Sequence, residues 1–269
     1  MTNTTVGSTP QETTMVTTNS WVISQNSQIP TSIAMSEDGS LWIANWSEYL
    51  LHISPESNKI TPVRVTTQDN PAEVAYVTDG LGSQLWLILD ADVSRAATWY
   101  PNQSQLEFIN LTKEPRFIAW IESSNALWYI ATDLSLNIHV KEEEQTVDNG
   151  KYNALTVDEQ GEMIAVRESV TDDVFIRANQ DLKWTKVRSN FGGELVGFDS
   201  NDSLFILEVG LAKKDGHLSD SRLLSIQKDG DEKTIAVGSI IAAKIQGNKL
   251  VTVKRTMQGD MTVELKILN

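Results

Sequence analysis

The sequence predicts an all-β fold, a six-bladed β-propeller of four-stranded antiparallel blades. The first observation is a recurring motif in which a turn cluster is followed by an apolar strand. It is clearest within residues 36–46, where Asp38-Gly39 marks a tight turn and Leu41-Trp42-Ile43 begins a strand. The motif returns with drift along the chain, and its strands start at Leu41, Leu85, Leu127, Met163, Leu204 and Leu250.

The spacing of these strand starts is the second observation. Subtracting the residue numbers gives intervals of 44, 42, 36, 41 and 46 residues. A unit of about 40 residues that holds roughly four short strands is typical of one propeller blade. Six such units therefore predict six blades.

The two ends of the chain provide the third observation. From about residue 240 the last unit supplies three strands rather than four. We expect residues 21–23 to complete the sixth blade as its outermost strand, because closing the ring with both chain ends removes an exposed sheet edge. Residues 1–18 are rich in Thr, Ser and Asn, and we expect a disordered tail that is not a signal peptide. Residues 19–269 then form one propeller domain.

Within each blade we expect the first strand to be the innermost, because these segments are small or apolar in the middle. The predicted first strands are residues 32–35, 73–77, 116–121, 153–157, 195–199 and 240–245. The second strand carries the Leu-aromatic pair, whose rings fill the space between neighbouring sheets. Blade five has a long segment, residues 210–221, between its second and third strands. This segment either arches over the channel mouth or forms a solvated hairpin tip.

The composition limits the classes of partner that the chain is expected to bind. The chain of 269 residues carries a net charge of −14 and has no cysteine. Nucleic acid is a poor partner for an acidic chain with no basic patch, and no apolar run is long enough to predict a membrane span. We expect a monomer that binds a small molecule. The absence of cysteine favours the cytoplasm, although secreted bacterial proteins often lack cysteine too, and secretion stays open.

Residues 29–45 and the segment that follows at 51–55 carry a family resemblance. The matching motifs are Pro30-Thr-Ser-Ile-Ala, Asp38-Gly-Ser-Leu-Trp and Ile53-Ser-Pro. This segment resembles the repeat of the virginiamycin B lyase-like and NHL/SMP-30-like propellers. The resemblance implies a site for a small molecule or a partner at one end of the channel. Virginiamycin lyases use a His and acidic residues with magnesium, and SMP-30-type lactonases hold a divalent cation at the channel mouth. The resemblance and the acidic balance thus make Mg²⁺ or Ca²⁺ a candidate cofactor, although neither residue set aligns with this chain.

The predicted site lies at the channel end where the second strands finish and the first strands begin. Counting four and five residues from the start of each second strand reaches this end. In blades four, five, six and one, these positions are expected to form a half-ring of opposed charges with an aromatic wall. The predicted catalytic residues are Glu208 or Glu168 for acid/base work, with Arg167 and Lys254 stabilising negative charge. The predicted substrate-binding residues are Asn45, Trp46, Arg116, Tyr152, Glu194, Arg255 and, from the blade-five segment, His217.

Two functions stay open. The first is a small-molecule enzyme of the lyase or cyclase/hydrolase type, which the opposed charges and the lyase-like repeat favour. The second is a non-catalytic propeller that binds a ligand or a protein on the same face. It is favoured by the missing catalytic set and by charged strand ends, which often form only surface ion pairs.

Overall fold

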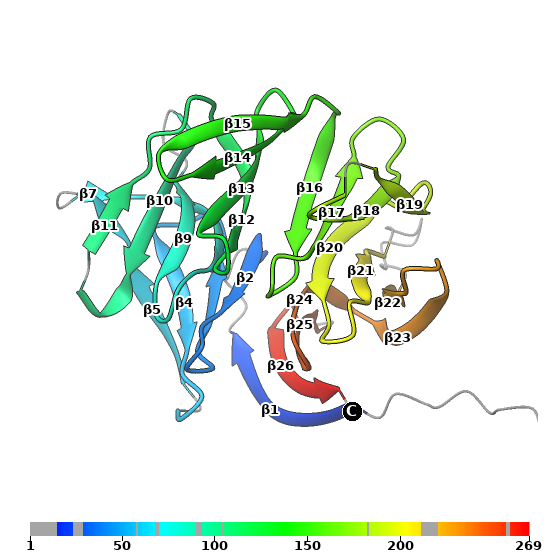
Figure 1. Ribbon diagram of the computed structural model, residues 1–269. Helices are drawn as coiled ribbons and strands as arrows, with labels where there is room; N and C mark the ends of the chain where they lie inside the picture. The colour runs from blue at the N-terminus through cyan, green and yellow to red at the C-terminus, as the bar shows by residue number, and fades with distance from the viewer. Residues whose placement is uncertain are drawn as a thin grey trace, which may run out of the picture.

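The computed structural model describes residues 15–23, 29–57, 59–67, 70–89, 93–103, 105–181, 183–210, 220–256 and 259–268. The six-bladed propeller is confirmed, with six four-stranded antiparallel sheets arranged as blades (Figure 1). Neighbouring first strands contact one another in the order β2, β8, β12, β16, β20, β24 and back to β2. This closed circle of first strands surrounds the channel. Within the described part of the chain, no helix is long and apolar enough to cross a membrane.

Each blade runs in chain order from the channel outward, except that the first strand of the chain joins the last blade. Blades one to three contain β2 (Ser32–Met35), β3 (Leu41–Ala44), β4 (Tyr49–Ile53), β5 (Ile60–Arg64), β8 (Val74–Asp79), β9 (Leu85–Leu89), β10 (Arg95–Tyr100), β11 (Gln105–Phe108), β12 (Pro115–Ile121), β13 (Ala126–Ala131), β14 (Leu136–Val140) and β15 (Glu143–Asp148).

Blades four to six contain β16 (Tyr152–Val157), β17 (Met163–Glu168), β18 (Val174–Ala178), β19 (Thr185–Arg188), β20 (Gly193–Phe198), β21 (Leu204–Glu208), β22 (Ser221–Ile226), β23 (Glu232–Gly238), β24 (Ile240–Gln246), β25 (Lys249–Arg255), β26 (Met261–Leu268) and β1 (Met15–Ile23). Between blades one and two lies the small pair β6 (Thr66–Thr67) and β7 (Asn70–Pro71), and the 3-10 turn η1 (Pro101–Gln103) follows β10.

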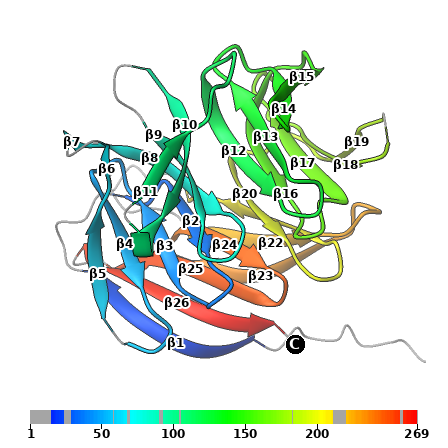
Figure 2. The same ribbon diagram turned by 60° about the vertical axis from the view of Figure 1, so that its left-hand side comes forward.

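The ring closes as the sequence predicts. Strand β1 pairs antiparallel with β26, and the two run side by side in both views (Figures 1 and 2). Trp21 and Ile23 are buried against the core that blades six and one share, whereas Val22 between them is exposed. This alternation places one face of the strand on the core. The strand is longer than expected and begins at Met15, so residues 15–18 of the expected tail belong to it.

The second strands are the most deeply buried elements, because a neighbouring sheet packs on each of their faces. All residues of β3, β9 and β13 are buried. Their Leu-aromatic pairs fill the space between blades, as predicted. For example, the ring of Trp42 in blade one lies edge-on to Trp99 in blade two, with centroids 5.5 Å apart. Such packing leaves polar side chains at the channel and at the strand ends.

Candidate functional site

The channel holds two cavities, one at each end. We call the first the Glu194 mouth; it lies where the first strands begin, has a volume of about 230 Å³ and is lined by Asn153, Arg167 and Glu194 among others. We call the second the Glu159 mouth; it lies where the first strands end, has a volume of about 240 Å³ and is lined by Asp79, Asp158 and Glu159 among others. Four residues line both cavities and separate them, namely Tyr76, Leu155, Thr156 and Lys244.

The two mouths differ in charge. In the described part of the chain, the Glu159 mouth is lined by five carboxylates and one ammonium, from Glu37, Asp79, Glu122, Asp158, Glu159 and Lys244. The Glu194 mouth is lined by two cations, Arg167 and Lys244, and one carboxylate, Glu194. A cavity lined mainly by one sign of charge focuses the field and concentrates ligands of opposite sign. The Glu194 mouth therefore suits an anion, even though the chain as a whole has a net charge of −14.

Arg167 is held in place at the Glu194 mouth. It lies on β17 and donates a hydrogen bond from Nε to Oδ1 of Asn153 on β16, over 2.8 Å. Its guanidinium also donates to the backbone carbonyl of Gly193, and Asp172 Oδ1 lies 3.8 Å from Nε. Burial lowers the pKa of Arg167, and the carboxylates of Asp172 and Glu194 oppose this change. Arginine stays charged, so the mouth has a fixed cation.

Glu194 is the carboxylate of this mouth. It lies near the start of β20, where protein surrounds it on most sides while the opening leaves its side chain accessible to solvent. Burial raises the pKa of Glu194 to about 7, and the positive charge of Arg167 opposes part of that rise. A carboxyl group with this pKa exists in both protonation states near neutral pH, as a group that transfers protons must.

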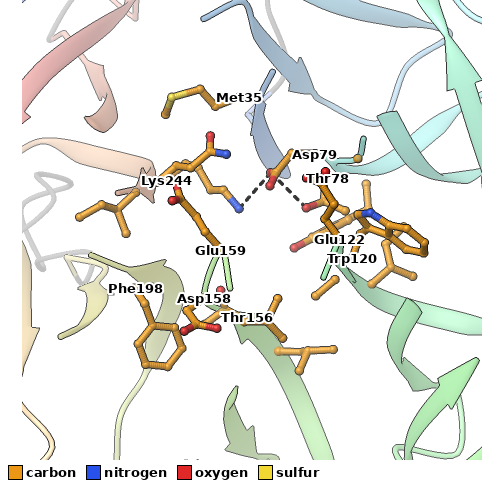
Figure 3. Close-up of a pocket in the computed structure, with 18 of the residues that line it drawn as sticks. Met35, Thr78, Asp79, Trp120, Glu122, Thr156, Asp158, Glu159, Phe198 and Lys244 are labelled. Carbon is orange, nitrogen blue, oxygen red and sulfur yellow. Dashed lines mark hydrogen bonds and ion pairs between the residues drawn. The ribbon is translucent and has the colours of Figure 1, made fainter. Parts of the chain in front are cut away.

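The Glu159 mouth has a different arrangement (Figure 3). Lys244 reaches across it toward Asp79, with Nζ 3.3 Å from Oδ1. Burial raises the pKa values of Asp158 and Glu159, and Asp79 adds to the rise at Glu159. Asp158 is also tied to the fold, since Oδ1 accepts the backbone N–H of Met163 over 3.0 Å. The single cation of this mouth is thus already paired.

Four of the predicted site residues lie at the Glu194 mouth or beside it. Arg167 and Glu194 line the mouth itself. Trp46 and Arg116 line an adjoining groove of about 480 Å³, which we call the Trp46 groove and which is also lined by Tyr76, Ile88 and Phe117. Trp46, the aromatic side chain expected at the site, therefore lines a groove beside the mouth that holds Arg167 and Glu194.

The other predicted catalytic residues lie on the blades outside this mouth. Glu208 forms ion pairs with Arg188, 2.6 Å from Nη2, and with Arg222, which lies directly opposite it in the register of β21 and β22. Lys254 pairs with Glu264 on the adjacent strand, 2.9 Å away. Glu168 accepts a hydrogen bond from the hydroxyl of Thr171. All three take partners from their own blade or its neighbour.

The remaining predicted binding residues are also placed outside the mouth, or lie outside the described residues. Tyr152 is buried between blades and donates its hydroxyl to Asp148, over 3.0 Å. Asn45 is buried and accepts from Ser47 Oγ over 2.7 Å, and Arg255 is exposed. His217 lies outside the described residues.

Among the residues that line the Glu194 mouth, sequence reasoning missed Tyr76, Asn153 and Lys244. Each lies within a predicted first strand. A signal was present, because a large or polar side chain within an otherwise small, apolar innermost strand has only the channel to occupy. Burial and the carboxylates of Asp79 and Glu194 raise the pKa of Tyr76, so its phenol stays protonated at neutral pH.

These features define a class, a six-bladed propeller whose channel has one mouth lined by two cations and one carboxylate and a second mouth that is acidic. No protein-family model matches the chain, and no curated protein matches it. Solved structures share the fold. A virginiamycin B lyase from Staphylococcus aureus is 12% identical, covers 95% of this chain and 100% of its own, and has a TM-score of 0.60.

Two further solved structures belong to the other group that the repeat resembles. A calcium-binding protein, regucalcin, from Agrobacterium tumefaciens str. C58 is 13% identical over 92% of this chain and 93% of its own, with a TM-score of 0.63. A gluconolactonase from Xanthomonas campestris is 11% identical over 91% of this chain and 88% of its own, with a TM-score of 0.65. The predicted resemblance to these propellers is confirmed for the fold.

The divalent cation expected from the sequence would need a cluster of oxygen ligands. Among the described residues, no group of three or more His, Asp or Glu side chains is arranged so that it could hold a metal ion. Asp79 and Glu159, which line one mouth, are accompanied by the ammonium of Lys244. The described side chains therefore do not fit a cation site.

Proposed function

We propose that this propeller is a small-molecule enzyme of the lyase or cyclase/hydrolase type whose site is the Glu194 mouth. The observation that carries the proposal is that one cavity is lined both by the carboxyl group of Glu194 and by the guanidinium of Arg167, which Asn153 holds in place. The solved structures of similar fold include a lyase and a gluconolactonase, which supports an enzyme of this kind.

In this proposal Glu194 is the acid/base group. As a carboxylate it takes a proton from a carbon next to a substrate carbonyl, or from a hydroxyl group or water that attacks that carbonyl. Negative charge then develops on the carbonyl oxygen, and the guanidinium of Arg167 stabilises it. The protonated Glu194 returns the proton to the leaving oxygen as its bond to carbon breaks.

Tyr76 and Lys244 complete the floor of the mouth. Because its phenol stays protonated, Tyr76 can donate a hydrogen bond to a substrate oxygen. Lys244 also lines the mouth, while its ammonium pairs with Asp79 at the other end of the channel, so Arg167 is the cation that favours an anionic substrate here. Asn153 acts through Arg167 and is a positioning residue.

The test uses a panel of lactones, and of esters with a leaving group β to the carbonyl, with turnover followed by NMR. Glu194→Gln should lower kcat/KM by about 100-fold or more, since general acid/base groups contribute roughly that much. Glu122→Gln, an exposed carboxylate of the opposite mouth, is the matched control and should keep wild-type turnover. Turnover that survives Glu194→Gln but is lost in Glu208→Gln would overturn the proposal and favour the site predicted from the sequence.

The divalent cation is tested separately by thermal unfolding with Mg²⁺, with Ca²⁺ and with a chelator. A rise in Tm that the chelator reverses and Glu194→Gln removes would assign a cation to this mouth. A rise that persists in Glu194→Gln would place the cation elsewhere.

A second candidate function is a non-catalytic propeller that binds a ligand or a protein. One solved structure of similar fold, described as YCF48 bound to D1 peptide, favours it, at 11% identity over 87% of this chain and 79% of its own, with a TM-score of 0.56. Binding without turnover across the whole panel would favour this candidate.

A further inference from the structure

The Trp46 groove adjoins the Glu194 mouth. Thr31, Tyr76 and Phe117 line both hollows, so their walls are shared. The mouth has a volume of about 230 Å³ and the groove about 480 Å³. The two adjoining hollows together offer room for a ligand larger than the mouth alone.

The groove has an aromatic lining. The rings of Tyr76 and Phe117 lie edge to face with centroids 6.1 Å apart, and the guanidinium carbon of Arg116 is 5.8 Å from the Phe117 centroid. Ile88, which is buried, also lines it. Aromatic pairs of this geometry and arginines above rings favour a further flat ring.

Trp46 presents its indole ring to the same groove at an energetic cost. Its side chain is 48% exposed and its backbone has φ of 55°, a conformation rare for a bulky residue. The next residue fixes this conformation, because the carbonyl of Ser47 accepts the N–H of Val74 over 2.8 Å. Strain held by the surrounding structure together with an exposed large ring is typical of a functional position.

The charges around the combined space select an anion. Among the described residues that line the mouth and the groove, the charged ones are Arg116, Arg167, Lys244 and Glu194, three cations against one carboxylate. Asp172, beside Arg167, lies outside the lining. Lys244 already pairs with Asp79, so a neutral aromatic ligand would use the groove but gain no charge interaction with Arg116 and Arg167.

We propose that the mouth and the groove together bind an aryl carboxylate, with its ring against Trp46 in the groove and its carboxylate beside Arg167 in the mouth. The inference deepens the proposed function, since it names the substrate class of the same mouth, and it rests on that function only for the chemistry that follows binding. Binding itself can be measured without turnover.

The experiment is a calorimetric titration of the full chain with three probes of matched size. These are 3-phenylpropanoate, 3-cyclohexylpropanoate, which lacks the aromatic ring, and 3-phenylpropanamide, which lacks the charge. We expect 3-phenylpropanoate to bind at least fivefold more tightly than either of the other two. Equal binding of the phenyl and cyclohexyl acids, or no binding of any probe at millimolar concentration, would overturn the inference.

Variants then locate the ring. Trp46→Asn keeps a residue that tolerates positive φ and removes the indole, so it should abolish the preference for phenyl over cyclohexyl while the protein stays folded. Tyr49→Ala removes another exposed aromatic ring of blade one and is the matched control, with the preference unchanged. A preference that survives Trp46→Asn would overturn the placement of the ring.

The outcomes separate this inference from the proposed function. Aryl-selective binding that depends on Trp46, without turnover of any aryl ester or lactone, would uphold the inference and overturn the enzyme. Turnover of a substrate without an aromatic ring that is lost in Glu194→Gln and unchanged in Trp46→Asn would uphold the enzyme and overturn the inference.

Discussion

Nε of Arg167 donates a hydrogen bond to Oδ1 of Asn153 over 2.8 Å, and this bond joins the first two strands of blade four at the channel. Through it the cation of the mouth depends on a neutral side chain from the innermost strand. The other contacts of Arg167, to the Gly193 carbonyl and to Asp172, come from blade five and from the turn after β17. The guanidinium is therefore held from three sides.

The first prediction concerns Asn153. Asn153→Ala should weaken the binding of 3-phenylpropanoate about fivefold, which corresponds to roughly 1 kcal/mol, because the guanidinium loses one of the hydrogen bonds that position it. Binding of the neutral 3-phenylpropanamide should not change, because only the position of the cation is affected. Calorimetry measures both ligands, and an equal loss for the two would indicate a general disturbance of the mouth instead.

The second prediction concerns the pH dependence of stability through Glu194. The pKa of Glu194 rises from 4.5 to about 7 on folding, so the folded chain binds more protons than the unfolded chain between these values. The contribution of this group to the free energy of unfolding therefore falls as pH increases from about 4.5 to about 7. Glu194→Gln removes that contribution. Denaturant unfolding of both proteins across this range should show wild type losing stability relative to the variant, and parallel curves would contradict the shift.

The third prediction concerns the Glu159 mouth. Nζ of Lys244 lies 3.3 Å from Oδ1 of Asp79, and the two side chains are 20% and 28% exposed, respectively. Lys244→Met should lower the free energy of unfolding at pH 7, because it leaves Asp79 and Glu159 close together without their cation. A double-mutant cycle with Asp79→Asn should give a coupling energy of about 1 kcal/mol. A coupling near zero would mean that solvent screens the pair fully.

The fourth prediction concerns ring closure. Trp21 is 4% exposed and packs into the core between blades six and one, so Trp21→Ala should destabilise the fold by about 3–5 kcal/mol. Val22 on the same strand is 68% exposed, and Val22→Ala is the matched control that should change stability by less than about 0.5 kcal/mol. Similar losses from the two substitutions would contradict the inward and outward alternation of β1.

Much of the fold could be predicted because its signals are local. The turn at Asp38-Gly39 and the strand from Leu41 lie next to each other in the chain, and their repetition reports the number of blades. The site was harder to predict from the sequence than the fold. Glu208 occupies a suitable position at a strand end, yet the antiparallel register places Arg222 directly opposite it, and Arg188 from blade four reaches its other oxygen. Partners of this kind depend on register and on contacts between blades, which spacing along the chain does not report.

The sequence by itself determined the six blades, the innermost strands and the closure by an N-terminal strand, because hydrophobic period and turn chemistry act over a few residues. Only the tertiary structure decided which polar side chains share a cavity. Tyr76 comes from blade two, Glu194 from blade five and Lys244 from blade six, and they meet only because closing the ring turns their strands toward one axis. The same closure places five carboxylates at the Glu159 mouth and Arg167 at the Glu194 mouth, with Lys244 lining both.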